Sequence, residues 1–189
     1  MKKLFLLTLV LIVTVFTFNM CKSPKSLQKA TEAEEVEIPF TDSKYQTNKD
    51  AFRATQSGRS PDLSTAKKIA LTNAKTLLAS NVQSIIKACT DNYTNQRTVG
   101  DKQEFENKFE ELSRQVTNQQ LSDVRLIDEK TFKEKDGKYT YWVAIEMPRD
   151  ALLDQISESI SKEKKLQLDF DKHQYEKIMQ EEMEKFENK

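Results

Sequence analysis

The sequence predicts an α+β fold in one small domain, with elements in the order β-α-α-β-β-α. A short alternating segment is followed by a long apolar stripe at helical spacing and then by a second helical pattern. After these, the period of the apolar residues changes to two. Asp136-Gly137 lies between two alternating segments and indicates a hairpin.

Composition limits the classes of function. The chain has 189 residues with 30 basic and 30 acidic side chains, whereas a general nucleic-acid binder carries a surplus of cations. We therefore expect no nucleic-acid partner. One His, two Cys and three scattered Gly do not form the common metal-binding, zinc-knuckle or phosphate-loop motifs. We predict no cofactor, no metal site and no enzymatic activity.

Residues 1–20 resemble a signal peptide. Lys2 and Lys3 precede an apolar run from Leu4 to Phe18, and this length fits the apolar part of a secretory signal. A membrane-spanning helix needs about 20 apolar residues. An uncleaved signal anchor remains the alternative.

Cys21 follows this run where a bacterial lipoprotein signal places the lipidated cysteine, although Met20 is larger than the residue usual before it. The resemblance implies attachment to a membrane through lipid on Cys21, and the non-acidic Lys22 implies the outer membrane, facing the periplasm. In the other interpretation, Cys21 belongs to a signal that is removed further along the chain. Residues 21–50 have few apolar residues and predict a lipid-anchored flexible tether, within which Val36 to Phe40 could dock as a short strand.

Residues 51–57 alternate and predict the first strand, which we expect to end at Gly58-Arg59. Ser60 is the expected helix cap and Pro61 fits the first turn. A core helix is predicted over 62–90 from apolar residues at helical spacing, namely Leu63, Ala66, Ala70, Ala74, Leu77, Val82, Ile85 and Cys89, with Ile69, Leu78 and Ile86 widening the stripe. Cys89 lies on this stripe, which favours a buried free thiol over a disulfide with Cys21.

The second helix is predicted from Glu104 to Gln115, with continuation to about Gln120. Two alternating strands follow, and Asp136-Gly137 favours a two-residue type I′ turn between them. That loop would pair Phe132 with Tyr141 and Leu126 with Met147. It would also place Asp128 and Lys130 opposite apolar residues, so we expect a bulge or a partly exposed face.

Pro148 is expected to end the last strand and to open a helix with an apolar stripe of Leu153, Ile156 and Ile160. The domain is then predicted over 51–160. Residues 161–189 are rich in Lys and Glu and predict one long charged helical extension, either solvated or paired with a partner helix.

Three aromatic residues and the single histidine are the remaining candidates for chemistry. Tyr139, Tyr141 and Trp142 could stack on a glycan or a base, but alternating aromatic residues beside a turn are more often hairpin core. His173 lies in a charged segment and is expected at the surface. No catalytic, cofactor-binding or metal-ligating residue is predicted.

Two stretches carry a family resemblance. Residues 52–58 (FRATQSG), continued by 62–75 (DLSTAKKIALTNAK), and residues 138–148 (KYTYWVAIEMP) resemble the twenty-kilodalton bacterial lipoprotein family. A similar module begins the flagellar T-ring proteins. The resemblance covers roughly residues 50–160 and implies a small α+β domain in an envelope-associated protein of undefined molecular function.

These observations predict a non-enzymatic cell-envelope lipoprotein with a structural or interaction role. Its expected partners are a membrane, through the lipid on Cys21, and another protein or a second copy, through the long helices. The alternatives are a soluble periplasmic binding or chaperone-like protein and a signal-anchored envelope protein.

Overall fold

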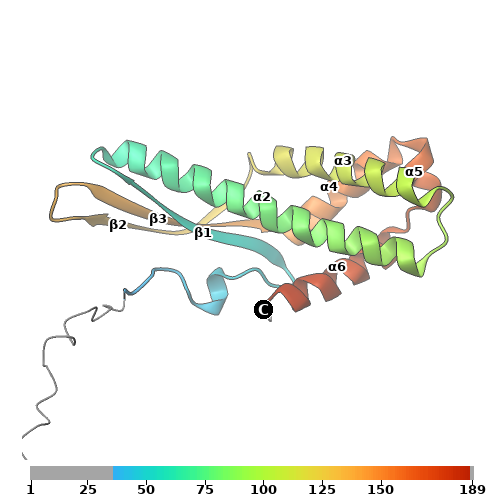
Figure 1. The fold of residues 1–189 in the computed structure, drawn as a ribbon, viewed down its shortest axis with the longest axis horizontal. Coiled ribbons are helices and arrows are strands. Elements are labelled where there is room, and N and C mark those ends of the chain that lie inside the picture. The colour runs from blue at the N-terminus through green and yellow to red at the C-terminus, as the bar shows by residue number, and fades with distance from the viewer. Residues whose placement is uncertain (1–35, 188–189) are drawn as a thin grey trace, which may run out of the picture. The chain divides into compact units, whose positions relative to one another are not determined.

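The α+β class and the predicted order of elements are confirmed in the computed structural model, which describes residues 36–187 (Figure 1). In chain order the elements are η1 (Ser43–Tyr45), β1 (Ala51–Ser60), α2 (Leu63–Gln96), α3 (Lys102–Gln120), β2 (Arg125–Lys133), β3 (Tyr139–Pro148), α4 (Arg149–Ser161), α5 (Lys164–Asp169) and α6 (Lys172–Glu187).

The three strands form an antiparallel sheet in the order β1-β3-β2, with β3 in the centre. Because successive side chains alternate between faces, Tyr141, Val143, Ile145 and Met147 of β3 lie on one face, and all four are buried in the main core. The long helix α2 crosses this inner face, and its C-terminal half continues beyond the sheet to meet the other helices (Figure 1).

Strand β1 runs through Gly58 to Ser60, beyond the predicted end at residue 57. Gly58 does not end the strand; it lies in β1 where the backbone of α2 packs directly against it. A Cβ atom on Gly58 would lie 2.4 Å from the carbonyl oxygen of Ala66 and 2.4 Å from the amide nitrogen of Ala70. Glycine therefore serves close packing here, not a turn.

Helix α2 begins one residue later than predicted, at Leu63, and ends six residues later, at Gln96 instead of residue 90. Its cap is Asp62, whose carboxylate accepts a hydrogen bond from the Thr65 amide at 2.7 Å, so the prediction of Ser60 as the cap was wrong. Most of the predicted stripe is buried, but Leu63 and Ile69 are exposed.

The far end of α2 is surrounded by aromatic side chains. Tyr93 is fully buried, and its ring centroid lies 5.7–6.2 Å from those of three other rings. Its hydroxyl donates to the Asp169 carbonyl at 2.7 Å and accepts from the Asp171 amide at 2.8 Å. The other rings of this cluster are Phe105, Phe109, Phe170 and Tyr175.

The predicted second helix is present as α3, and the loop that connects α2 to α3 is short, residues 97–101.

The hairpin between β2 and β3 differs from the prediction. A type I′ turn needs positive φ at both central residues, but here Gly137 has φ 83° and Asp136 does not have positive φ. The Gly137 amide donates to the Glu134 carbonyl, and the Glu134 amide donates to the Lys138 carbonyl. This longer loop shifts the register, so Phe132 lies opposite Thr140 and Leu126 opposite Ile145. The predicted irregularity is confirmed as a register shift between Leu126 and Asp128.

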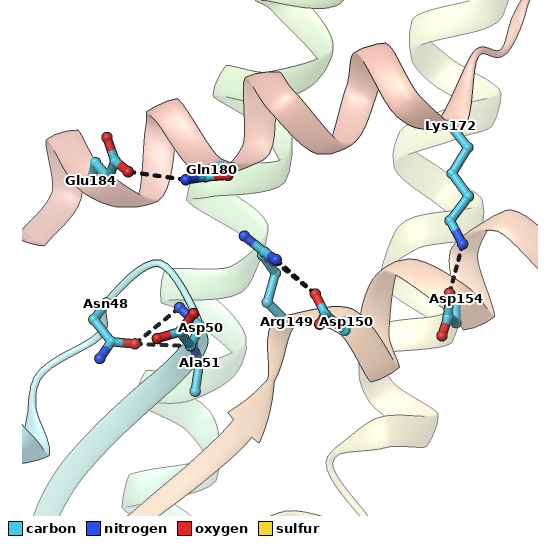
Figure 2. Close-up of polar contacts among 9 residues, drawn as sticks. All are labelled: Asn48, Asp50, Ala51, Arg149, Asp150, Asp154, Lys172, Gln180 and Glu184. Carbon is cyan, nitrogen blue, oxygen red and sulfur yellow. Dashed lines mark hydrogen bonds and ion pairs between the residues drawn. The ribbon is translucent and has the colours of Figure 1, made fainter.

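The charged C-terminal segment is not one helix. It is broken at Phe170-Asp171 into α5 and α6, and α6 packs against α2 through Tyr175, Ile178, Met179 and Met183, all of which are buried. An ion pair of 2.7 Å between Lys172 and Asp154 joins the start of α6 to α4 (Figure 2). Residues 164–187 thus complete the core and do not form an extension to it.

Part of the predicted tether also belongs to the folded unit, which begins at Ile38. Phe40 and Tyr45 are buried against Ala144 and Trp142 on the outer face of the sheet, so the prediction of a flexible segment was wrong for residues 38–50. The predicted strand at Val36–Phe40 is absent. The Asn48 side chain accepts hydrogen bonds from the Asp50 and Ala51 amides where β1 begins (Figure 2). Residues 1–35 lie outside the described residues.

Candidate functional site

The candidate site is a groove beside α2, on the inner face of the sheet. A helix with its side chains is about 10–12 Å wide, and strands lie about 4.8 Å apart, so one helix covers about two strands. Helix α2 packs mainly on β1 and β3. The inner face of β2 is left beside it as an open groove of about 250 Å³.

Helix α2 forms one wall of the groove and strand β3 forms its floor, and their lining residues repeat at similar distances. Lys67, Leu71 and Lys75 of α2 line one wall at intervals of four residues, which is about 6 Å of helix rise. Along β3, Tyr141, Val143 and Ile145 form the floor at intervals of two residues, which is about 7 Å of strand. The groove therefore extends for about 12 Å along α2.

One end of the groove is closed by a polar triad. The Lys67 ammonium lies 3.3 Å from the Glu129 carboxylate and 5.2 Å from the centre of the Tyr141 ring. The Tyr141 hydroxyl donates a hydrogen bond to the same carboxylate. That bond lowers the pKa of Glu129, and burial raises the pKa of Tyr141. Both effects keep a neutral phenol beside a charged carboxylate, so this triad offers neither a nucleophile nor a free base at neutral pH.

The middle of the groove is apolar and the other end is cationic. Val143 and Ile145 of the floor are buried, whereas Leu71 and Leu126 on the two sides are 36% and 55% exposed. Lys75, which lies about 12 Å along α2 from Lys67, lines the groove together with Ser122 and Val124. It is half-buried, and among residues 36–187 it has no carboxylate partner. An apolar channel beside an ammonium group that lacks a carboxylate partner within the described residues is a geometry suited to binding.

The predicted lipid-attachment residue, Cys21, lies outside the described residues. Cys89 is confirmed as a buried free thiol, and burial raises its pKa well above the usual range, so it is not a nucleophilic thiolate. His173 is exposed near the start of α6, as expected. The structure does not bring Cys89, His173 and the groove together.

The three aromatic residues considered as a stacking platform are divided by the pleat of β3. Tyr139 and Tyr141 face α2 in the main core, whereas Trp142 packs on the opposite face with Phe40 and Tyr45. The alternative, hairpin core, is the one that the structure supports. Tyr141 is the one of the three that lines the groove.

The groove was missed in the sequence because its residues look like the solvent-facing side of a helix. Lys67, Leu71 and Lys75 recur every four residues, and this spacing places them on one side of α2. The apolar Leu71 between two lysines was the available signal. The exposed position of Leu71 has a meaning only once the structure shows that β2 lies uncovered beside this side of α2.

Comparison with known proteins gives no relative. No family model, no curated protein and no solved structure matches the chain. The resemblance to the twenty-kilodalton lipoprotein family therefore stays a prediction.

Two further findings concern residues 36–187. Within this range no helix is both long and apolar enough to cross a membrane. No group of three His, Cys, Asp or Glu side chains in the same range is arranged to hold a metal ion.

Proposed function

We propose that this protein is a non-enzymatic lipoprotein of the bacterial cell envelope, attached to a membrane through Cys21 and acting by binding. The observation that carries the proposal is the position of Cys21, three residues after the end of an apolar run of signal-peptide length that follows a basic start. Lys22 favours the outer membrane, with the folded unit in the periplasm. The resemblance of residues 50–160 to the twenty-kilodalton lipoprotein family points the same way.

The state of the reactive side chains supports a binding role over a catalytic one. The buried Cys89 is held as a thiol, and the Glu129 carboxylate is already engaged by Lys67 and Tyr141. Nucleophilic catalysis needs an activated nucleophile within reach of a base. The groove instead offers apolar surface and, in Lys75, an ammonium group that has no carboxylate partner among residues 36–187.

The anchor is tested by removing each cysteine in turn. With Cys21→Ser, we expect no incorporation of an alkyne-tagged fatty acid in growing cells and release of the protein from the membrane fraction. Cys89→Ala is the matched control, because it also removes one thiol and is expected to leave labelling and membrane attachment unchanged. Acyl chains contribute about 0.8 kcal/mol for each buried CH₂ group, so loss of lipid should change fractionation completely.

Intact-mass analysis of the membrane-bound protein distinguishes the alternatives. A mass equal to that of a chain that begins at Cys21 and carries acyl groups supports the proposal. An unaltered protein whose mass still includes residues 1–20 and no acyl group would refute it in favour of a signal anchor.

The chaperone-like alternative gains no support from the structure. In that alternative the long charged helices hold a client. The apolar side of α6 is instead buried against the protein's own core, through Tyr175, Ile178 and Met179.

A further inference from the structure

We propose that the groove between α2 and β2 binds an amphipathic anion: a soluble carboxylate with a single unbranched apolar chain. The proposal rests on the groove alone and holds whether or not Cys21 carries lipid. Its three supports are the dimensions of the groove, its apolar middle and its uncompensated positive charge.

The dimensions favour a single chain. Pockets that take drug-sized molecules have volumes of about 300–1,000 Å³, whereas this groove holds about 250 Å³ spread over about 12 Å of length. A space of this volume and length suits one extended chain better than the paired chains of a phospholipid. The walls that such a chain would touch are Leu71, Leu126, Val143 and Ile145.

The charges favour an anionic head group beside Lys75. Glu129 is neutralised by Lys67 and hydrogen-bonded by Tyr141, so it is not available to a cationic ligand. Lys75 remains as the uncompensated charge of the lining. A carboxylate beside Lys75 would place its chain over Leu71 and Leu126, whereas a quaternary ammonium head in the same position would be repelled.

The apolar surface would otherwise stay exposed to water. Lysine side chains can lie along apolar surface with their ammonium groups in water. In a groove without a ligand, the methylene groups of Lys67 and Lys75 would then only cover part of Leu71 and Leu126. If the groove binds no ligand, anionic and cationic amphiphiles should not differ in their binding to it. Comparing two such amphiphiles therefore tests the proposal directly.

The experiment uses the full chain in phosphatidylcholine nanodiscs and a decanoic acid carrying a terminal diazirine. After illumination, tandem mass spectrometry maps the labelled residues. We expect adducts within residues 67–75 and 122–129. Unlabelled decanoate should compete with the probe, and decyltrimethylammonium, which has the same chain and the opposite charge, should not.

Charge-reversed variants test the head-group position. Lys75→Glu should reduce labelling about five-fold, as expected for converting a partly exposed ion pair into a repulsive contact. Lys87→Glu is the matched control, because Lys87 is an exposed lysine of the same helix outside the groove. Its labelling should equal that of the wild type.

A second pair tests the chain position. Leu126→Glu puts a carboxylate in the apolar middle and should abolish labelling, whereas Phe132→Glu changes an exposed residue of the same strand outside the groove and should not. Leu126 is 55% exposed, so the substitution is compatible with folding, and circular dichroism checks this. Should Leu126→Glu unfold the protein, the Lys75 and Lys87 pair decides alone.

Five outcomes would overturn the proposal. Three come from the probe itself: adducts that map elsewhere, equal competition by decanoate and decyltrimethylammonium, and equal labelling of Lys75→Glu and Lys87→Glu. The fourth is loss of labelling when part of the bilayer is replaced by phosphatidylglycerol, which would assign the groove to a bilayer lipid. The fifth is the formation of light-independent dimers that disappear with Leu126→Glu, which would assign the groove to a second copy of the chain.

Discussion

Gly58→Ala tests the close approach of α2 to β1. The added Cβ would lie 2.4 Å from two backbone atoms of α2, the Ala66 oxygen and the Ala70 nitrogen, and 2.8 Å from the Cβ of Ile69. Ordinary contact begins at 3.4 Å, so α2 must move away from β1 by about 1 Å. Backbone atoms cannot rotate aside as a flexible side chain can. The displaced helix loses part of its packing on Phe52 and Ala54, which are buried.

Overpacking of this kind costs about 1–3 kcal/mol, and gaps of 0.5–1 Å forfeit a quarter to a half of each dispersion contact. We expect the free energy of unfolding in urea to fall by about 3 kcal/mol, or Tm to fall by roughly 6–12 °C. The other two glycines calibrate the result. In Gly100→Ala the added Cβ lies 3.7 Å from its nearest atom, so the free energy of unfolding should not change. Gly137→Ala places a side chain at φ 83° and should lower the free energy of unfolding by about 1–2 kcal/mol. If Gly58→Ala proved no more costly than Gly100→Ala, the close approach of α2 to β1 would be refuted.

Three further predictions use the same unfolding assay or simple spectroscopy. Tyr93→Phe removes the hydroxyl that bridges the break between α5 and α6 and should cost about 1–3 kcal/mol, whereas Tyr139→Phe, with no such bridge, should cost less than half as much. Asp62→Asn should make the free energy of unfolding fall less steeply as the pH is lowered below 4. Hydrogen bonds from Thr65 lower the pKa of Asp62 below its ordinary 3.8, so its contribution is present above pH 3.8 and is lost as the pH falls through the lower folded-state pKa. Because Asn also caps helices, stability at pH 7 should change little, and an unchanged slope below pH 4 would contradict the assignment. Phe40→Ala should expose Trp142, the only tryptophan, and shift its emission to longer wavelength. Val36→Ala, at a residue 75% exposed, should not, and equal spectra would show that residues 38–50 do not cover the outer face.

Periodicity predicted the elements well because the pattern of α2 and β3 is imposed by one continuous core. Ala66, Ala70 and Ala74 recur every four residues and are all fully buried. The boundaries were harder to predict. In Ser60-Pro61-Asp62 both Ser60 and Asp62 are good caps, and local sequence does not decide between them. The distant contact of Gly58 with α2, which lengthens β1, has no local signal.

The C-terminal break shows a different limit. No Gly or Pro occurs near Phe170-Asp171, so the run of charged residues looked continuous. A local signal was present: the Asp171 carboxylate accepts from the Gln174 amide at 3.1 Å, and an acidic cap followed by Gln three residues later marks a helix start. The other cause, the Tyr93 hydroxyl, comes from 78 residues away and could not be predicted from the sequence.

The candidate groove depends on where α2 sits over the sheet, and this in turn depends on small side chains. Gly58, Ala66 and Ala70 let α2 approach β1 closely, so the helix lies toward that edge and leaves β2 uncovered on the inner face. A sheet of three strands is wider than one helix, and the outer face is covered instead by Phe40 and Tyr45. It follows that stability and ligand binding are coupled through the same contact. The shift of α2 caused by Gly58→Ala should change the groove as well as the free energy of unfolding, whereas Gly137→Ala, at the hairpin loop, should lower stability and leave labelling of the groove unchanged.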